Sequence, residues 1–95
     1  MTQNTEPTAG EWCVFPCSAL NAERGIYEAY VESTSDAHVV SIVFGHTAKQ
    51  AIANAYCMAA SKDMQKALEL YFSGVRRDIY EDAFRAALEK SKVKP

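Results

Sequence analysis

The residues best suited to thiol or metal chemistry are three cysteines and two histidines in this chain of 95 residues. Cys13 and Cys17 have three residues between them, whereas zinc ribbons and redox-active thiol pairs have two. In one straight strand their Cα atoms would be about 13 Å apart, too far for a disulfide or a shared metal ion. Only a change of chain direction at Pro16 would bring them together. We expect ordinary reduced thiols, Cys57 as a small core residue, and no metal or other cofactor.

Neither histidine has the partner that acid–base catalysis requires. His38 begins an apolar segment and His46 precedes a helix start, and no Ser/His/Asp or Cys/His spacing includes either residue. The Gly-x-Ser-x-Gly, P-loop and dinucleotide-binding motifs are absent from the sequence. The sequence therefore predicts a protein that is not an enzyme.

Acidic side chains gather in the first part of the chain. Residues 1–36 contain six acids and one base, a net charge of −5, and residues 37–95 contain nine bases and six acids, a net charge of +3. In the first part, carboxylates alternate with tyrosines, which are common in protein interfaces. The candidate partner-binding residues of this acidic hairpin are Glu23, Tyr27, Glu28, Tyr30, Glu32 and Asp36. The same pattern is also typical of an ordinary solvated surface.

Basic side chains in the last part of the chain form an alternative candidate site. Arg76, Arg77 and Arg85 could contact the phosphates of a nucleic acid. Acidic residues alternate with these arginines at helical spacing, so we expect most of them to pair locally on a solvated helix face. The strand tyrosines have glutamate neighbours, which disfavours stacking on single-stranded nucleic acid. Nucleic-acid binding is therefore the less favoured interpretation.

The first half of the chain has the composition of strands. Aromatic and β-branched residues favour strands over 12–15, 26–32 and 38–44, and residues 18–25 have the polar composition of a turn. Alternation within the second strand divides the acidic hairpin between two faces. One face has Ile26, Glu28, Tyr30 and Glu32, and the other has Tyr27, Ala29 and Val31.

The second half of the chain has the period of a helix. Thr47 and Gln50 form a capping-box pattern before a helix over 48–60. Ser61 fits the cap of a second helix, and a further helical pattern covers 78–90. The sequence leaves open whether Gly74 ends a helix or lies within a longer one.

These elements predict an α+β fold, with a three-stranded antiparallel β-meander followed by two or three α-helices packed on one face of the sheet. We expect a flexible tail over 1–10, a single domain over 11–90 and a basic tail over 91–95. No signal peptide and no apolar run of about 20 residues is visible, so we expect a cytoplasmic protein without a membrane partner.

The helix that contains residues 51–68 resembles a motif of small phage and prophage proteins, A-x-A-N-A-x-L-I-A-A-A-P-D-L-L-x-A-L. The matching residues are Ala51-x-Ala53-Asn54-Ala55-x-x-Met58-Ala59-Ala60-Ser61-x-Asp63-Met64-x-x-Ala67-Leu68. The segment over 84–90 is similar to the end of those proteins, A-R-A-A-[IL]-x-K. The chain departs from the motif at Tyr56 and Cys57, and at Lys62, where those proteins have proline.

The motif has a structural explanation. Alanine at 51, 55 and 59 would let another backbone approach the helix closely, and the side chain of Asn54 can satisfy a backbone group that crosses it. The motif therefore predicts a packing arrangement more directly than it predicts a site.

The resemblance implies a phage or prophage origin, no enzyme activity and a place in the bacterial host cytoplasm. Small phage accessory proteins commonly bind and block a host protein, and host-defence inhibitors such as anti-CRISPR proteins are one subclass. The favoured hypothesis is thus a non-enzymatic accessory protein that binds and modulates or inhibits a host protein, such as a host-defence component, and forms a homodimer or other homo-oligomer. The alternatives are a nucleic-acid-binding regulator and an oligomeric sponge for a signalling nucleotide.

Overall fold

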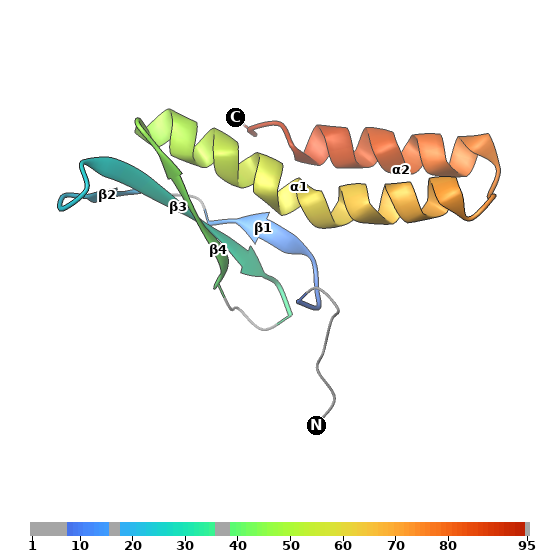
Figure 1. Cartoon of the computed structure of the whole chain (residues 1–95), viewed down its shortest axis with the longest axis horizontal. Coiled ribbons are helices and arrows are strands. Elements are labelled where there is room, and N and C mark those ends of the chain that lie inside the picture. The colour runs from blue at the N-terminus through green and yellow to red at the C-terminus, as the bar shows by residue number, and fades with distance from the viewer. Residues whose placement is uncertain (1–7, 16–17, 36–38, 95) are drawn as a thin grey trace, which may run out of the picture.

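A four-stranded antiparallel sheet and two helices make up the part of the chain that the computed structural model describes, residues 8–15, 18–35 and 39–94 (Figure 1). The strands are β1 (Trp12–Val14), β2 (Ala19–Asn21), β3 (Ile26–Ser33) and β4 (Val39–Gly45), and the helices are α1 (Ala48–Phe72) and α2 (Arg77–Lys90). The expected α+β class is confirmed, with two helices rather than three. Most of the predicted N-terminal tail lies outside the described residues, as do Cys17, Asp36 and His38.

The sheet has a fourth strand because residues 18–25, which were predicted to form a turn, contain the short strand β2. Tyr27 and Glu28 pair with both β2 and β4, and Val31 and Glu32 pair with both β1 and β4. β1 and β2 therefore share one edge of β3, and β4 occupies the other. The prediction of three strands was wrong because Ala19–Asn21 has no strand-like composition and pairs only because β3 is long enough to offer it a free edge. The turn itself follows at Gly25, where φ is +65°.

α1 begins where the capping pattern predicts. The Thr47 hydroxyl accepts a hydrogen bond from the backbone N–H of Gln50 at 3.1 Å, and the Gln50 side chain accepts from the N–H of His46 at 3.0 Å. The helix then runs through Ser61, so the predicted second helix start there is wrong. The Ser61 hydroxyl instead donates to the carbonyl oxygen of Met58 at 2.7 Å, a bond that keeps serine compatible with a helix interior.

Gly74 ends α1. It has a φ of +83°, the left-handed conformation that commonly terminates helices. The preceding Ser73 donates its backbone N–H to the carbonyls of Glu69 and Leu70. The chain then reverses into α2, so the question that the sequence left open is resolved as two separate helices.

α1 packs across one face of the sheet, which we call the covered face. The buried residues there are small, and they are Ala29, Val31, Ala51, Ala55 and Ala59. Trp12, Val14, Tyr27, Val40 and Val43 pack around them. The approach is closest at Gly45, where an added Cβ atom would lie 2.4 Å from the backbone nitrogen of Ala51. The expectation that the alanine stripe allows a close backbone approach is confirmed.

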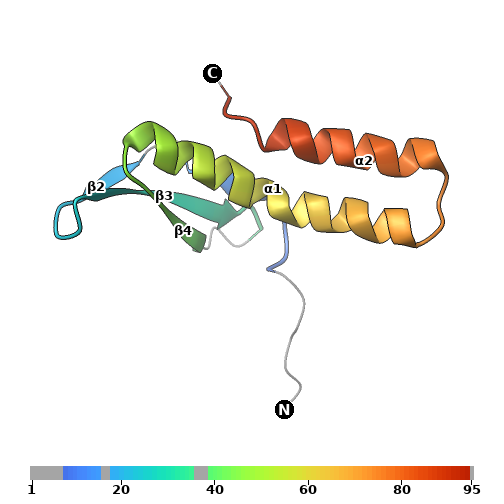
Figure 2. The same ribbon diagram turned by 45° about the horizontal axis from the view of Figure 1, so that its top comes forward.

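α2 packs along the C-terminal half of α1 and forms a helical hairpin with it. Figures 1 and 2 both show the sheet beside the N-terminal half of α1, with the hairpin extending beyond the sheet. Ala67 and Ala87 are buried in the hairpin. The ring of Tyr71 packs edge-to-face against that of Tyr80, with centroids 5.0 Å apart. The hairpin thus has its own contact surface, separate from the covered face.

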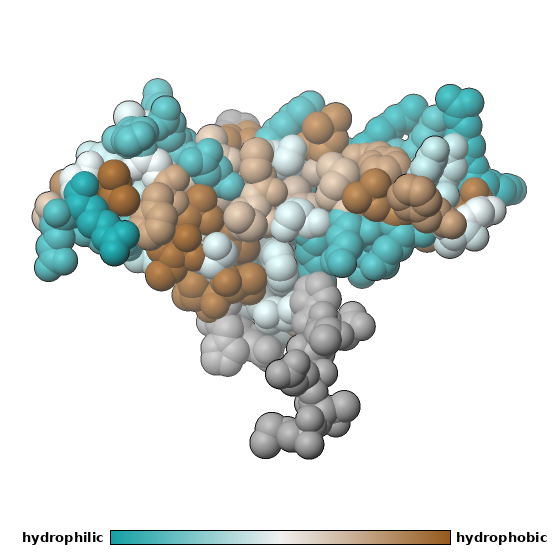
Figure 3. Space-filling model, in the orientation of Figure 1, coloured by the Kyte–Doolittle hydropathy of each residue, from teal (hydrophilic) through white to brown (hydrophobic). Residues whose placement is uncertain are grey.

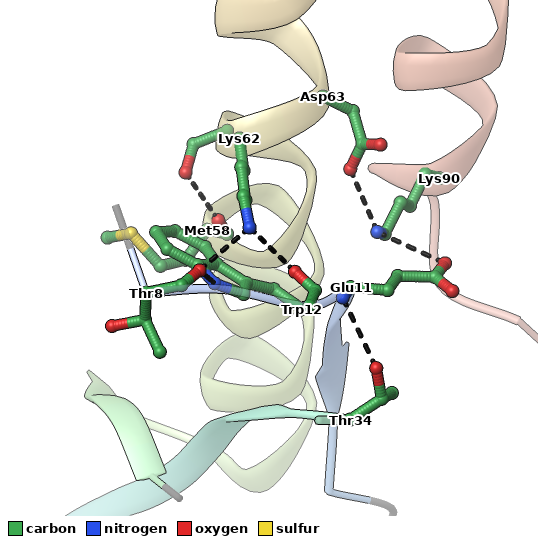
Figure 4. Close-up of polar contacts among 10 residues, drawn as sticks. Thr8, Glu11, Trp12, Thr34, Met58, Lys62, Asp63 and Lys90 are labelled. Carbon is green, nitrogen blue, oxygen red and sulfur yellow. Dashed lines mark hydrogen bonds and ion pairs between the residues drawn. The ribbon is translucent and has the colours of Figure 1, made fainter. Parts of the chain in front are cut away.

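Lys62 holds the segment that precedes β1. Its ammonium group donates to the carbonyl oxygens of Thr8 and Gly10, at 2.7 Å each, and lies 5.7 Å from the centre of the Trp12 ring (Figure 4). The Trp12 indole N–H also donates to the Thr8 carbonyl, at 3.0 Å. Lys62, one of the positions where this chain departs from the phage motif, therefore anchors residues 8–10 to α1.

Lys90 makes a second connection between the helices and β1. Its ammonium group lies 2.8 Å from the carboxylate of Asp63 and 3.3 Å from that of Glu11 (Figure 4). Asp63 lies within α1, two residues after the Ser61 position where a new helix start was predicted, and faces the end of α2. This pair of contacts fixes the C-terminal end of the hairpin over the start of the sheet.

Candidate functional site

The face of the sheet opposite α1, which we call the open face, has the densest group of exposed apolar side chains on the strands. Residues that pair directly across two strands share a face. Tyr30 pairs with Ile42, Glu28 with Phe44 and Glu32 with Val39. Phe15 joins them, because its backbone N–H donates to the Tyr30 carbonyl at 2.9 Å. The open face is therefore defined by Phe15, Glu28, Tyr30, Glu32, Val39, Ile42 and Phe44.

The apolar side chains of the open face are large and half-exposed. Phe15 is 40% exposed, Phe44 42%, Ile42 49% and Val39 50%. Figure 3 shows hydrophobic residues gathered over the region of β4. A hollow of about 250 Å³ lies among Phe15, Tyr30, Glu32 and Val39. An apolar side chain of a partner would fit this hollow, with the Glu32 carboxylate at its rim.

The carboxylate of Glu28 is held in place on the open face. The side-chain amide of Asn21 donates to one of its oxygens at 2.8 Å, and the Tyr30 hydroxyl donates to the other at 2.9 Å. These bonds, and the charge of Arg24, lower the pKa of Glu28 below its ordinary value. The open face thus has a fixed negative charge beside Phe44.

The structure brings together only part of the acidic hairpin predicted from the sequence. Glu28, Tyr30 and Glu32 lie on the open face, as the alternation predicted. Tyr27 lies on the covered face and packs against the core, so it does not join them. Glu23 is exposed in the turn between β2 and β3, away from the hollow. Asp36 lies outside the described residues.

Sequence reasoning missed the apolar half of this surface. Phe15, Val39, Ile42 and Phe44 were assigned to strands but not to a site. The signal was the unbroken apolar run in β4, because a strand with only one buried face alternates apolar and polar residues. β4 has apolar side chains on both faces, and the helices of this chain can cover only one face of the sheet. The other apolar face is therefore expected to stay exposed.

The arginines of the alternative nucleic-acid site are mostly paired with acids. Arg77 lies 2.7 Å from the Glu81 carboxylate, four residues further on, as the helical spacing predicted, and Arg76, just before α2, lies 2.9 Å from the Asp78 carboxylate. The Glu81 carboxylate raises the pKa of Arg77. Arg85 is exposed on α2. The structure therefore does not gather these cations into one unneutralised patch.

A second apolar hollow, of about 390 Å³, lies on the hairpin. It is lined by Cys57, Ala60, Ser61, Met64, Gln65, Leu68 and Ser91. Cys57 was expected in the core but is exposed here, because the buried stripe of α1 is formed by the alanines instead. The hollow has no charged residue in its lining.

The cysteines and histidines do not converge in the described part of the chain. Cys13 is a free, exposed thiol on β1, opposite Glu32 of β3. His46 lines a hollow with Phe44, Gln50 and Asn54 at the start of α1. Among residues 8–15, 18–35 and 39–94, no three His, Cys, Asp or Glu side chains are arranged to hold a metal ion.

Comparison of the chain with protein-family models, curated proteins and solved structures finds no significant match. Within the described residues, neither helix is both long and apolar enough to cross a membrane. The chemistry of the open face is therefore the main guide to function.

Proposed function

We propose that this chain is a non-enzymatic binding protein whose open face docks a partner protein. The observation that supports this proposal is the group of four large apolar side chains, each 40–50% exposed, on a sheet face that no described element covers. Contiguous exposed apolar surface of this kind is uncommon on soluble proteins outside interaction sites. Aromatic rings flanked by polar groups are also typical of interface centres.

The charges of the open face define the chemistry of the partner. Glu28 is held as an anion by Asn21 and Tyr30, and Glu32 lies at the rim of the hollow beside Phe15. The partner surface that complements this arrangement has an apolar side chain for the hollow and arginine or lysine on either side. A fixed carboxylate is a good acceptor for arginine because little side-chain freedom is lost on binding.

The resemblance of the α1 motif to small phage and prophage proteins extends the proposal to a biological role. On this view the chain is a phage or prophage accessory protein in the bacterial cytoplasm, and the partner is a host protein that it modulates or inhibits. A host-defence component, as for anti-CRISPR proteins, is the subclass that we favour. Among the described residues, no observation favours the nucleic-acid or nucleotide-sponge alternatives.

The proposal is tested by affinity capture from a bacterial lysate at moderate salt, followed by mass spectrometry. Four baits are compared: the wild-type chain, Phe15→Ser, the double variant Glu28→Lys with Glu32→Lys, and Leu68→Ser. Leu68 is the matched control, because it is 46% exposed on the hairpin, far along the chain from the open face. We expect one stoichiometric protein with the wild type and with Leu68→Ser, and its loss from the two open-face variants.

Other outcomes of this capture contradict the proposal. A partner retained by Phe15→Ser but lost from Leu68→Ser would move the binding surface to the hairpin. Absence of any stoichiometric protein would remove the protein-binding function. A gel shift at low salt would then test nucleic acid, and thermal stabilisation by cyclic nucleotides would test the sponge.

A further inference from the structure

The outer edge of β4 is unpaired among the described residues. β3 pairs with β1 and β2 along one edge and with β4 along the other, so β4 ends the sheet on its side. A strand at the end of a sheet presents a row of backbone donors and acceptors to its surroundings. This row can pair with a strand from another chain.

The direction in which the N–H and C=O groups of β4 point follows from the hydrogen bond between Phe15, directly after β1, and Tyr30 of β3. Phe15 donates to the carbonyl of Tyr30, so the backbone groups of Tyr30 face β1, and those of its neighbours Ala29 and Val31 face β4. Ile42 lies opposite Tyr30, so its N–H and C=O point away from β3. Phe44 has the same direction, and its carbonyl accepts the side-chain amide of Asn54 at 2.8 Å.

β4 lacks most of the features that protect an edge strand. Charged side chains, proline and a covering segment commonly block pairing at natural sheet edges. The sequence Val39–Gly45 has no charged residue and no proline, although the register shift beside Val40 makes one end irregular. Asn54 covers a single carbonyl, that of Phe44, and leaves the backbone groups of Ile42 facing outward.

We infer that two copies of this chain pair through their β4 edges, antiparallel and with a two-fold axis at Ile42. In this arrangement the N–H of Ile42 in each copy donates to the C=O of Ile42 in the other, so both groups are satisfied by symmetry. The sheet then continues from one copy into the next, with the open faces of both on the same side.

A second copy fits this edge for a reason of charge. The paired segment of each copy, Val39–Gly45, has no charged residue, so no like charges oppose each other across the interface. Stacking of two open faces, by contrast, would bring Glu28 and Glu32 against their own copies.

Pairing through β4 goes beyond the proposed function and is independent of it. The continuous sheet presents two hollows, each formed by Phe15, Tyr30, Glu32 and Val39, on one surface. A dimer of this kind binds a partner at two points when the partner is itself dimeric or repetitive, which raises the overall affinity. Loss of the dimer would leave each hollow intact.

The first experiment measures the mass of the full chain in solution by size-exclusion chromatography with light scattering. We expect twice the 10.5 kDa of one chain for the wild type, and for Ile42→Thr, which keeps the backbone N–H. Ile42→Pro should give a mass of one chain, because proline removes that N–H. Proline is tolerated at such an edge position, since Ile42 makes no backbone bond to β3. A monomeric wild type, or a dimeric Ile42→Pro, would overturn the inference.

A second experiment covers the case in which Ile42→Pro does not fold. Ile42→Cys, in a background with the native cysteines replaced by serine, should form a disulfide-linked dimer on mild oxidation. Residues in a hydrogen-bonded antiparallel pair have Cα atoms about 5.5 Å apart, within disulfide range. Leu20→Cys, on the opposite edge of the sheet and 56% exposed, should stay monomeric. Equal cross-linking of the two variants would contradict the β4 interface.

The two proposals fail separately. Glu28→Lys with Glu32→Lys should abolish partner capture and leave the dimer mass unchanged. A dimer lost in Leu68→Ser but kept in Ile42→Pro would assign self-association to the hairpin hollow instead.

Discussion

The two faces of the sheet reverse the usual relation between side-chain size and burial. The buried centre of the covered face consists of four alanines and one valine, with Trp12 and Tyr27 among the partly buried side chains around it, whereas the open face has two phenylalanines, an isoleucine and a valine that are half-exposed. Large apolar side chains normally fill the core, because they gain most from leaving water. Here the core is formed by small residues because α1 approaches the sheet so closely that nothing larger fits at positions such as Gly45.

This difference shows that the two faces have different tasks. Close packing of small residues fixes the position of α1 on the covered face, but each of these residues buries little apolar area. The open face holds apolar area that the core does not use, and under the proposed function a partner surface buries it. The following changes test this comparison, from the largest expected effect to the smallest.

The largest effect is expected at the closest approach of the covered face. Gly45→Ala places a Cβ atom against the backbone of Ala51, so we expect the free energy of unfolding to fall by about 3 kcal/mol. Urea unfolding measures the loss. Gly74→Ala is the control, because open space surrounds it and only its φ of +83° opposes a side chain, at a cost of about 1 kcal/mol. Equal losses would mean that α1 tolerates a greater distance from β4.

Exchange of side-chain size should affect the two faces differently. Ala55→Leu overfills the covered face, where Ala55 is fully buried, and should lower the free energy of unfolding by about 2 kcal/mol. Val39→Thr on the open face keeps the shape and should change it by less than about 0.5 kcal/mol. Both values come from unfolding at one protein concentration. A larger loss for Val39→Thr would show that the open face already contributes to a buried contact.

Asn54 connects α1 to the edge of β4, and Asn54→Asp tests that connection at constant size. At neutral pH the variant loses the donor and places a carboxylate beside the Phe44 carbonyl, so we expect a loss of about 1–2 kcal/mol. The loss should shrink as the pH falls, because a protonated carboxyl can donate in place of the amide. A pH-independent loss would mean that the bond to Phe44 is not the cause.

The smallest effect is expected at Glu28. Its pKa is lowered by Asn21 first and Tyr30 second, so Asn21→Ala should raise it more than Tyr30→Phe does. A group whose pKa is lower in the folded chain adds stability above its unfolded pKa, and loses it as the pH falls through the folded value. The wild type and the variants should therefore converge in stability in acid. NMR titration of the Glu28 carboxyl measures the pKa, and an unchanged value in both variants would refute the assignment.

Local signals in the sequence determined the elements and several of their contacts. The change from strand-like to helical periodicity placed the boundary between sheet and helices, and Thr47 placed the start of α1. The alanine stripe and Asn54 predicted a close crossing of another backbone, which is confirmed. These features could be read from the sequence because each depends on residues within one or two helical turns.

Other local signals were overruled by packing. Ser61 fits a helix cap, but α1 continues because the Ser61 hydroxyl bonds within the helix, Ala59 before it packs against the sheet and Ala67 after it is buried in the hairpin. Ala19–Asn21 has no strand signal, yet it pairs with the end of β3. In both cases contacts distant in the sequence outweighed a preference worth about 1 kcal/mol or less.

The sequence by itself determined the fold class, the start of α1 and the division of β3 into two faces. Only the tertiary structure decided which of these faces α1 covers, and therefore that Tyr27 is packed while Tyr30 is presented with Phe15 and Ile42. The physical reason is that alternation defines two faces of a strand without defining their surroundings. That choice depends on how α1 packs back onto the sheet, where Ala55 and Ala59 of α1 join Ala29 and Val31 of β3 in one core.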